Sequence, residues 1–315
     1  MHLEGCFEAA LIAQWAKAEG VALPRPQEDL FKFSGLADFL GFLDLACGLA
    51  STPQRVAELC YGLCQRLADN GAGYADVIVN PTHWHAWHTR LPQMLDAMDA
   101  GFSAAEQDGL PGTGLCISLL RTQSADAATE LVEWLSRSKH PRVVALSVDG
   151  NEATAGRTGA RFAEAFRRAG AAGLRRTVHA GESSGPEGVW DAINLLGADR
   201  IDHGVRAMED PALVDLLAQR RIPLGICPTS NLVLGVYPSI QQHPIERLRQ
   251  AGVAVSVNTD DPALLGASLV GEYQLCRHAF GWSDDTLRAV ARTSIEASFA
   301  NADTKTHLLH ALNSW

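Results

Sequence analysis

Short apolar runs alternate with longer helix-like segments along most of this chain, and that alternation restricts the folds open to it. The runs, rich in β-branched residues, predict strands over Tyr74–Asn80, Gly114–Leu120, Arg142–Val148, Arg175–His179, Arg200–His203, Ile222–Cys227 and Val253–Asn258. Amphipathic stretches predict helices over Ala9–Glu19, Pro92–Gln107, Ala125–Lys139, Thr158–Gly170, Glu187–Leu196, Pro211–Gln219 and Pro244–Ala251. Near-continuous apolar strands between helices indicate a parallel sheet with both faces covered.

Two architectures satisfy this alternation: an open doubly wound sheet and an eight-fold barrel. The open sheet is typical of chains with a glycine-rich phosphate loop after an early strand, whereas Gly112-Thr113-Gly114 here precedes its strand. Polar residues instead follow several late strands, as in barrel enzymes whose sites lie at the C-terminal face. We therefore expect a (β/α)8 TIM barrel of the metal-dependent hydrolase type, folded as one domain over residues 1–315.

The strand count falls one short of this expectation. Seven strands are predicted where the barrel has eight, and the chain opens with Met1-His2-Leu3-Glu4-Gly5, which reads as a loop. The expectation is therefore that the first strand is truncated at the N-terminus and would precede Met1.

Charge and composition narrow the class of partner. A net charge of −10 disfavours nucleic acid, because binding it depends on Lys and Arg meeting phosphates. Apolar runs are too short for a membrane span, and the N-terminus lacks the pattern of a secretory signal. The seven cysteines are scattered, which is typical of buried thiols in a cytoplasmic protein. We expect a cytoplasmic enzyme acting on a small molecule; its oligomeric state stays open.

Three polar clusters follow predicted strands: His179-Ala180-Gly181-Glu182, Asp202-His203-Gly204 and Asn258-Thr259-Asp260-Asp261-Pro262. Imidazole and carboxylate suit zinc, and a His/Asp set on separate strand ends is typical of an open catalytic site. A neighbouring glutamate and a second histidine suit proton transfer. Each residue alone is more often a satisfied polar group or a turn residue, but the combination indicates metal-assisted hydrolysis.

With the opening His2-Leu3-Glu4-Gly5 and with Cys227-Pro228-Thr229-Ser230-Asn231, these clusters resemble the adenosine deaminase family in order and spacing over nearly the whole chain. The resemblance implies a zinc-bearing (β/α)8 barrel with one Zn²⁺ per chain that deaminates purines at C6. It also implies roles for individual residues: metal ligands His2, His179 and Asp260; proton donor Glu182 to purine N1; His203 acting on the attacking water; Asp261 at N7; the Gly150 N–H at N3; Glu4 at the ribose; and Ser230 supporting Asp260.

This chain departs from the family pattern at two places. The family's first strand ends in His-x-His, with both histidines binding zinc, whereas here only His2 is present. We therefore expect a further zinc-binding histidine upstream of Met1. Ser147 stands where many relatives have Asp.

A second His-x-His spacing lies in His83-Trp84-His85-Ala86-Trp87-His88, after an early strand. It could bind a metal, but a substrate-facing lid or an aromatic surface loop explains its two tryptophans better. As a lid, the loop would contact the base or its substituents and contribute to specificity.

The leading function predicted from the resemblance is hydrolytic deamination of adenosine or 2′-deoxyadenosine to the 6-oxo product and ammonia. Adenine, or a modified adenosine such as aminodeoxyfutalosine, is the alternative substrate within the class. The sequence also leaves open a catalytically impaired homologue with a binding role and a barrel that hydrolyses a non-purine substrate.

Overall fold

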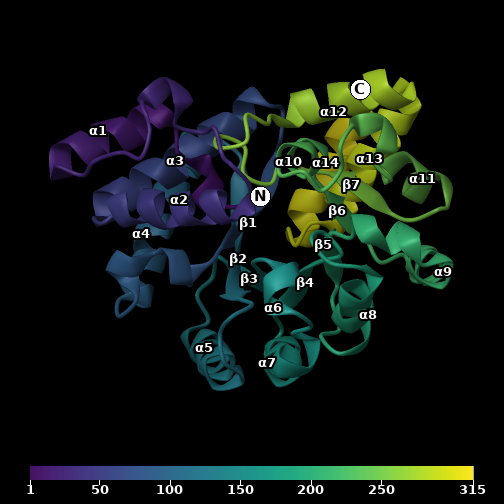
Figure 1. Cartoon of the computed structure of the whole chain (residues 1–315), viewed down its shortest axis with the longest axis horizontal. Helices are drawn as coiled ribbons and strands as arrows, with labels where there is room; N and C mark the ends of the chain where they lie inside the picture. The colour runs from purple at the N-terminus through teal and green to yellow at the C-terminus, as the bar shows by residue number, and fades with distance from the viewer. Residues whose placement is uncertain (315) are drawn as a thin grey trace.

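Seven parallel strands form one sheet in which each strand pairs with the next in sequence (Figure 1). The structure, a computed structural model, describes residues 1–314, without the side chains of residues 36 and 37. The strands are β1 (Tyr74–Val79), β2 (Gly112–Leu120), β3 (Val143–Asp149), β4 (Arg175–Ala180), β5 (Arg200–His203), β6 (Leu224–Ile226) and β7 (Val255–Val257). All seven predicted strands are confirmed, and the sequential parallel order is that of a barrel rather than of a doubly wound sheet.

Helices follow the strands and surround the sheet, as the ring of coiled ribbons in Figure 1 shows. They are α1 (Ala9–Glu19), α2 (Leu36–Leu49), α3 (Pro53–Asp69), α4 (Leu91–Gln107), α5 (Ala125–Ser138), α6 (Glu152–Ala155), α7 (Gly159–Ala171), α8 (Pro186–Asn194), α9 (Pro211–Arg220), α10 (Pro228–Val233), α11 (Ile245–Gln250), α12 (Leu269–Phe280), α13 (Asp284–Ala297) and α14 (Ala302–Asn313). Local chemistry explains several starts: the hydroxyls of Thr52 and Ser124 and the carboxylate of Asp210 accept backbone N–H bonds at the first turns of α3, α5 and α9. The seven predicted helices are confirmed within two residues at each end.

Residues 1–3 connect the two edges of the sheet. The Ile78 N–H donates to Met1 O at 2.8 Å and the Leu3 N–H donates to Ile78 O at 2.9 Å, so this short segment lies alongside β1. The His2 N–H donates to the carbonyl of Asp260, just beyond β7, at 2.9 Å. His2 is therefore held by both edges at the end of the sheet where the strands terminate.

A cavity of about 470 Å³ lies below this segment. Residues of β1 and β7 line it together with the C-terminal helices, and examples are Tyr74, Asp76, Ser256 and Leu308. Open volume therefore lies between the two edge strands, and the hydrogen bonds of residues 1–3 connect them near the strand ends.

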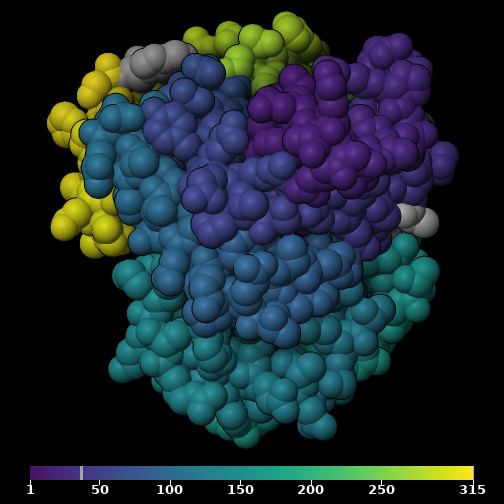
Figure 2. Space-filling model, turned by 90° about the vertical axis from the view of Figure 1, so that its left-hand side faces the viewer, coloured from purple at the N-terminus to yellow at the C-terminus, as the bar shows by residue number. Residues whose placement is uncertain are grey.

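The buried apolar side chains of the sheet and its surrounding helices form one large cluster that extends from Leu3 to Val290, with a small satellite around Ile78. In the space-filling view, the purple and blue helices of the N-terminal third form a continuous layer above the teal helices (Figure 2). All seven cysteines are buried free thiols, as predicted. Within residues 1–314, no helix is both long and apolar enough to cross a membrane.

Candidate active site

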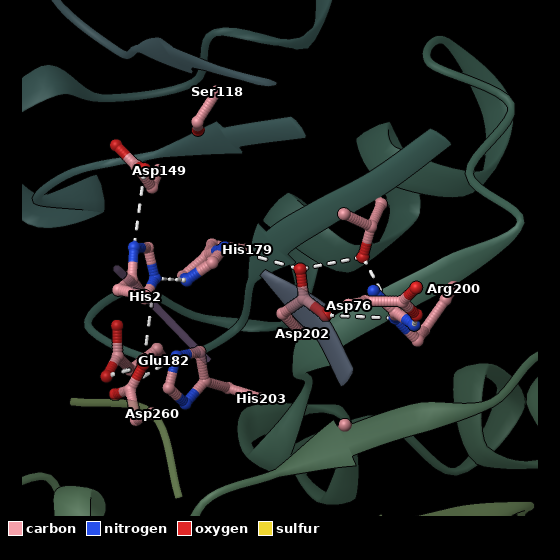
Figure 3. Close-up of polar contacts among 12 residues, drawn as sticks. His2, Asp76, Ser118, Asp149, His179, Glu182, Arg200, Asp202, His203 and Asp260 are labelled. Carbon is pink, nitrogen blue, oxygen red and sulfur yellow. Dashed lines mark hydrogen bonds and ion pairs between the residues drawn. The ribbon is translucent and has the colours of Figure 1, made fainter. Parts of the chain in front are cut away.

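The polar clusters predicted from the sequence meet at one end of the sheet (Figure 3). His179 lies near the end of β4, His203 ends β5 and Asp260 follows β7 by three residues. Parallel strands end at the same edge, so side chains from distant parts of the chain converge there. His2 reaches the same place from the edge of β1.

Three of these side chains form a donor set for a cation. The ligand atoms of His2, His179 and Asp260 all lie within 4.8 Å of one another. His2 Nε2 is 2.9 Å from His179 Nε2 and 3.7 Å from Asp260 Oδ1. Tetrahedral zinc with bonds of 2.0–2.1 Å separates its ligand atoms by about 3.3 Å, so these spacings fit zinc. Three protein ligands with a position left open are the arrangement of catalytic zinc sites.

A second possible donor set combines His203, Cys227 and Asp260. Its weak member is the thiol, because only the thiolate is a good metal ligand. Burial, followed by the negative charge of Asp260, raises the pKa of Cys227 well above its usual value. The first donor set is therefore the better candidate.

Electrostatics favour the metal-binding forms of the ligands. Burial opposes ionisation of Asp260, but the nearby imidazoles of His203, His2 and His179 outweigh it and lower the pKa of Asp260 to about 2. Burial and the neighbouring histidines hold the pKa of His179 well below its usual value. A carboxylate and a neutral imidazole are the forms that bind a divalent cation.

Glu182 and His203 lie beside this donor set as a proton-transfer pair. His203 Nε2 is 3.6 Å from Glu182 Oε1 and 3.9 Å from Asp260 Oδ2. Burial, and then the charges of Asp260 and Glu152, raise the pKa of Glu182 to about 7, against the opposing effect of His203. Burial lowers the pKa of His203, but Glu182 and Asp260 outweigh it and raise that pKa. Near neutral pH, this pair can therefore both supply and accept a proton.

Three carboxylate oxygens near the donor set are buried without a hydrogen-bond partner: Glu4 Oε2, Asp149 Oδ2 and Asp261 Oδ1. Burial and the charges of Asp260 and Glu4 raise the pKa of Asp261 well above its usual value. A Cβ at Gly5 would stand 2.2 Å from Asp261 Oδ1, so glycine is required for this close approach. Unpartnered buried oxygens are costly, which indicates that a ligand supplies donors here.

Two of the site residues have strained backbones. His203 has a φ of 65° and Asp260 a φ of 57°, in the left-handed region that L-residues rarely adopt. Such conformations cost about 1–3 kcal/mol each and concentrate at functional sites. The orientation of these two side chains is therefore obtained at a cost in folding free energy.

The remaining predicted residues lie around this centre. The Ser230 hydroxyl donates to Asp260 Oδ2 at 2.6 Å, and Gly150 follows β3 with a φ of 98°. Glu4 is fully buried, with its Oε1 accepting from the Asn80 N–H at 2.8 Å. Ser147 is fully buried and its hydroxyl makes no hydrogen bond.

The His83–His88 segment packs against the site. The Trp84 indole is fully buried and donates to Glu4 Oε1 at 2.7 Å, and so Trp84 is not part of an aromatic surface loop. His83 Nδ1 is 2.7 Å from Asp44 Oδ1, and His85 Nε2 is 3.6 Å from the same oxygen. Metal binding and movement of this segment as a lid stay predictions.

One buried network was not predicted from the sequence: Asp202, Arg200 and Asp76 form a chain behind His179 (Figure 3). Asp202 Oδ2 lies 3.4 Å from His179 Nδ1, on the side of the ring away from His2. Arg200 links Asp202 Oδ1 at 3.2 Å to Asp76 Oδ2 at 2.6 Å. The Asp-His-Gly motif contained a signal for Asp202, but nothing in the sequence marks its partners.

Glu152 and Arg121 were not predicted either. Glu152 accepts hydrogen bonds from the backbone of the loop that carries Glu182, and Arg121 donates to the carbonyl of His179. Glu152 belongs to the Asp149-Gly150-Asn151-Glu152 segment, in which the family pattern indicates a role only for the glycine. A single arginine such as Arg121 carries no motif.

Comparisons with known proteins agree on one family. The family model described as adenosine deaminase matches residues 1–315. An adenine deaminase of Rhizobium rhizogenes is 35% identical over 312 residues, covering 99% of this chain and 96% of its own length. The crystal structure of an adenine deaminase from Arthrobacter aurescens superposes with a TM-score of 0.93 at 29% identity, covering 100% of this chain and 97% of its own. An amidohydrolase from Burkholderia ambifaria with bound Zn gives a TM-score of 0.89 at 26% identity, covering 99% and 88%.

These matches span the whole chain, and they confirm the resemblance and the barrel fold inferred from the motifs. Enzymes of this family are hydrolases that deaminate adenine-like or adenosine-like purines. The chain belongs to the adenosine deaminase family.

Proposed function

We propose that this protein is a zinc-dependent aminohydrolase that converts free adenine to its 6-oxo product and ammonia. The observation that carries the proposal is the convergence of a three-residue cation donor set with the Glu182–His203 pair at one end of the sheet. Adenosine and 2′-deoxyadenosine, the leading substrates by sequence, become the second candidates.

The metal assignment rests on the donor set and on a relative. His2, His179 and Asp260 have the spacing that fits tetrahedral zinc, and the Burkholderia ambifaria amidohydrolase has bound Zn. When bound, zinc makes water acidic enough to supply hydroxide near neutral pH. The Ser230 hydroxyl and the surrounding imidazoles keep Asp260 oriented and ionised for this role.

The chain's own residues supply the proton transfers. An aromatic purine resists attack at C6, and protonation of ring N1 makes that carbon electrophilic. Glu182, with a pKa raised to about 7, holds a proton that it can donate to N1. His203, 3.6 Å away, accepts the proton lost by the attacking water. The exocyclic amine then takes up the proton held by His203 and leaves as ammonia. The hydroxyl proton at C6 returns to Glu182, and C6 retains the oxygen.

Two observations favour adenine over its nucleosides. Curated relatives that match nearly the whole chain are named adenine deaminase. Trp84 and the Asn80 N–H occupy one oxygen of Glu4, so only Glu4 Oε2 remains for a ligand. This oxygen can accept the imidazole N–H of the free base, a donor that adenosine lacks.

The test is ammonia release by the zinc-loaded protein from adenine, adenosine and 2′-deoxyadenosine, with zinc content measured on the same sample. We expect one zinc per chain and a kcat/KM for adenine at least about tenfold above that for either nucleoside, because a site that pairs a substrate N–H rejects analogues lacking it. A higher kcat/KM for a nucleoside would contradict the assignment of adenine as the substrate, but it would still support hydrolytic deamination. A zinc-loaded protein that binds hypoxanthine but releases no ammonia would support a catalytically impaired homologue.

A further inference from the structure

Glu152 lies behind the loop that carries Glu182, outside the set of residues that surround the cation site. It is the first residue of α6, follows β3 by three positions and is only 3% exposed. Burying a carboxylate costs free energy unless its oxygens accept hydrogen bonds. The hydrogen-bond partners of Glu152 therefore indicate which part of the chain this carboxylate positions.

All the backbone partners of this carboxylate belong to one loop. The Gly181 N–H donates to Oε1 at 3.1 Å, and the Glu182 and Ser183 N–H groups donate to Oε2 at 2.8 and 3.2 Å. The bond is reciprocated, because the Glu152 N–H donates to Ser183 Oγ at 3.1 Å. Gly181 has a φ of 65°, the left-handed conformation that lets successive N–H groups point to the same side.

Arg121 fastens the start of the same loop. This guanidinium is 5% exposed and donates to the carbonyl of His179, while Nη2 lies 3.7 Å from Glu152 Oε1. Its Nη1 donates to Thr158 Oγ1 at 2.7 Å, just before α7. The loop between His179 and Ser183 is therefore held at both ends by a buried ion pair whose members follow β2 and β3.

We propose that Glu152, paired with Arg121, is a positioning residue that holds the backbone of residues 181–183 so that Glu182 faces the cation site. The inference rests on the proposed role of Glu182 and adds a residue for which the reaction itself assigns no task. Glu152 makes no direct contact with the cation donors or the proton-transfer atoms in the contacts described above. It reaches Glu182 through the loop backbone, beside the effect of its charge on the Glu182 pKa.

Glu152→Gln tests this with little change in size. An amide can keep one acceptor oxygen towards the Glu182 and Ser183 N–H groups, but its NH2 group then faces the Gly181 N–H and Arg121. We expect kcat with adenine, per zinc-loaded site, to fall about 10- to 100-fold with KM changed less than about threefold, because small misplacements of a reacting group cost that much. Glu246→Gln, whose carboxylate bonds Arg249 and Trp282 away from the site, is the matched control and should retain full activity.

A double-mutant cycle separates positioning from general support of the fold. In a Glu182→Gln background the proton donor is already absent, so its position no longer affects the rate. Adding Glu152→Gln should then change kcat by less than about twofold. Effects that multiply in the double variant, or a Glu152→Gln kcat within twofold of wild type, would overturn the proposal. If Glu152→Gln does not fold, Ser183→Ala removes the reciprocal bond alone and should lower kcat in the same direction with the same non-additivity.

Amide hydrogen exchange tests how firmly residues 181–183 are held, independently of catalytic activity. Amides of residues 181–183 should exchange slowly in wild type and faster in Glu152→Gln, while those of β4 stay unchanged. Unchanged exchange at the loop would contradict the inference even if the wild-type protein deaminates adenine. A wild type that releases no ammonia, with exchange changed as expected, would instead count against the proposed function and leave the loop contact standing.

Discussion

At the scale of single residues, the acidity of Glu182 gives a pH dependence with a definite sign. Its pKa is raised to about 7, so the carboxyl is protonated below about pH 7 and loses its proton above it. If Glu182 is the proton donor, kcat should fall about tenfold per pH unit well above that pH. The raised pKa of His203, which must be unprotonated to accept a proton, acts on the low-pH side of the profile. The measurement is kcat against pH from about 5.5 to 9 with saturating adenine.

The matched variant for this profile is Glu182→Gln, which cannot titrate. It should lower kcat by about 10²–10⁴-fold and abolish the limb near pH 7, with zinc content unchanged. A wild-type kcat that stays flat to about pH 9 would remove Glu182 from the role of proton donor.

Asp202 leads to a prediction about metal affinity. Its Oδ2 lies 3.4 Å from His179 Nδ1, a nitrogen that has no hydrogen-bond partner within the described residues, so it is the carboxylate placed to orient this imidazole as a metal ligand and make it more basic. Asp202→Asn should weaken zinc binding about 10- to 100-fold in a chelator competition. Asp215→Asn, an exposed carboxylate on α9, should leave the affinity unchanged. Equal affinities of Asp202→Asn and wild type would show that the Asp202 carboxylate does not act on His179.

Residues that share a motif could be predicted, and residues that meet only in the folded chain could not. His179 and Glu182 stand three positions apart after one strand, so their common location follows from the strand direction. Glu4 and Trp84 are 80 residues apart, and Arg121 and His179 are 58 apart. No local pattern encodes such pairs, because a buried hydrogen bond needs only a donor and an acceptor brought together by the tertiary fold.

At the scale of elements, the strands were predictable because both faces of a parallel sheet are buried, which leaves continuous apolar runs in the sequence. The ends were harder: β6 and β7 each have three residues, shorter than the predicted runs Ile222–Cys227 and Val253–Asn258. Pro223, Ala254 and Asn258, which flank these strands, still make backbone hydrogen bonds to the neighbouring strand, so the differences concern only where each strand begins and ends. The periodicity of a helix predicts which of its faces is buried, but it does not predict which other helix packs against that face.

The contact between α3 and α4 shows how two similar glycines can differ. A Cβ at Gly101 on α4 would stand 2.3 Å from the carbonyl oxygen of Ala57 on α3. Gly62, in the middle of α3, is exposed and would have nothing within 4 Å of an added Cβ. Gly101→Ala should therefore destabilise the fold by about 1–3 kcal/mol through overpacking. Gly62→Ala should stabilise it by roughly 0.5–1 kcal/mol, since alanine is the better helix former.

Urea unfolding of the two zinc-loaded variants beside wild type measures both effects. Opposite shifts of the midpoint support the close helix contact. A Gly101→Ala protein as stable as wild type would mean that α3 and α4 separate at little cost, contrary to the packing described here.

At the scale of the whole molecule, the sheet and the cation site depend on each other. A cavity of about 470 Å³ lies between the edge strands β1 and β7, and residues 1–3 connect them by backbone hydrogen bonds. The cation donors come from that N-terminal segment, from β4 and from the segment that follows β7. A bound ion therefore joins both edges to the middle of the sheet, and its binding energy adds to the stability of the folded chain.

Removal of the metal should then lower global stability. A ligand that binds only the folded state stabilises it by RT ln(1 + [L]/Kd), about 2.7 kcal/mol at a free concentration 100 times Kd. We expect the urea midpoint to fall after chelation and to recover with added zinc in a concentration-dependent way. His179→Ala should abolish this response, whereas His278→Ala, an exposed histidine on α12, should keep it. Because zinc also binds histidine in unfolded chains, the gain will be smaller than the ideal value. Equal urea midpoints with and without zinc in the wild type would mean that His2, His179 and Asp260 do not bind one ion together. That result would contradict the metal in the proposed function, but it would not affect the family or the fold.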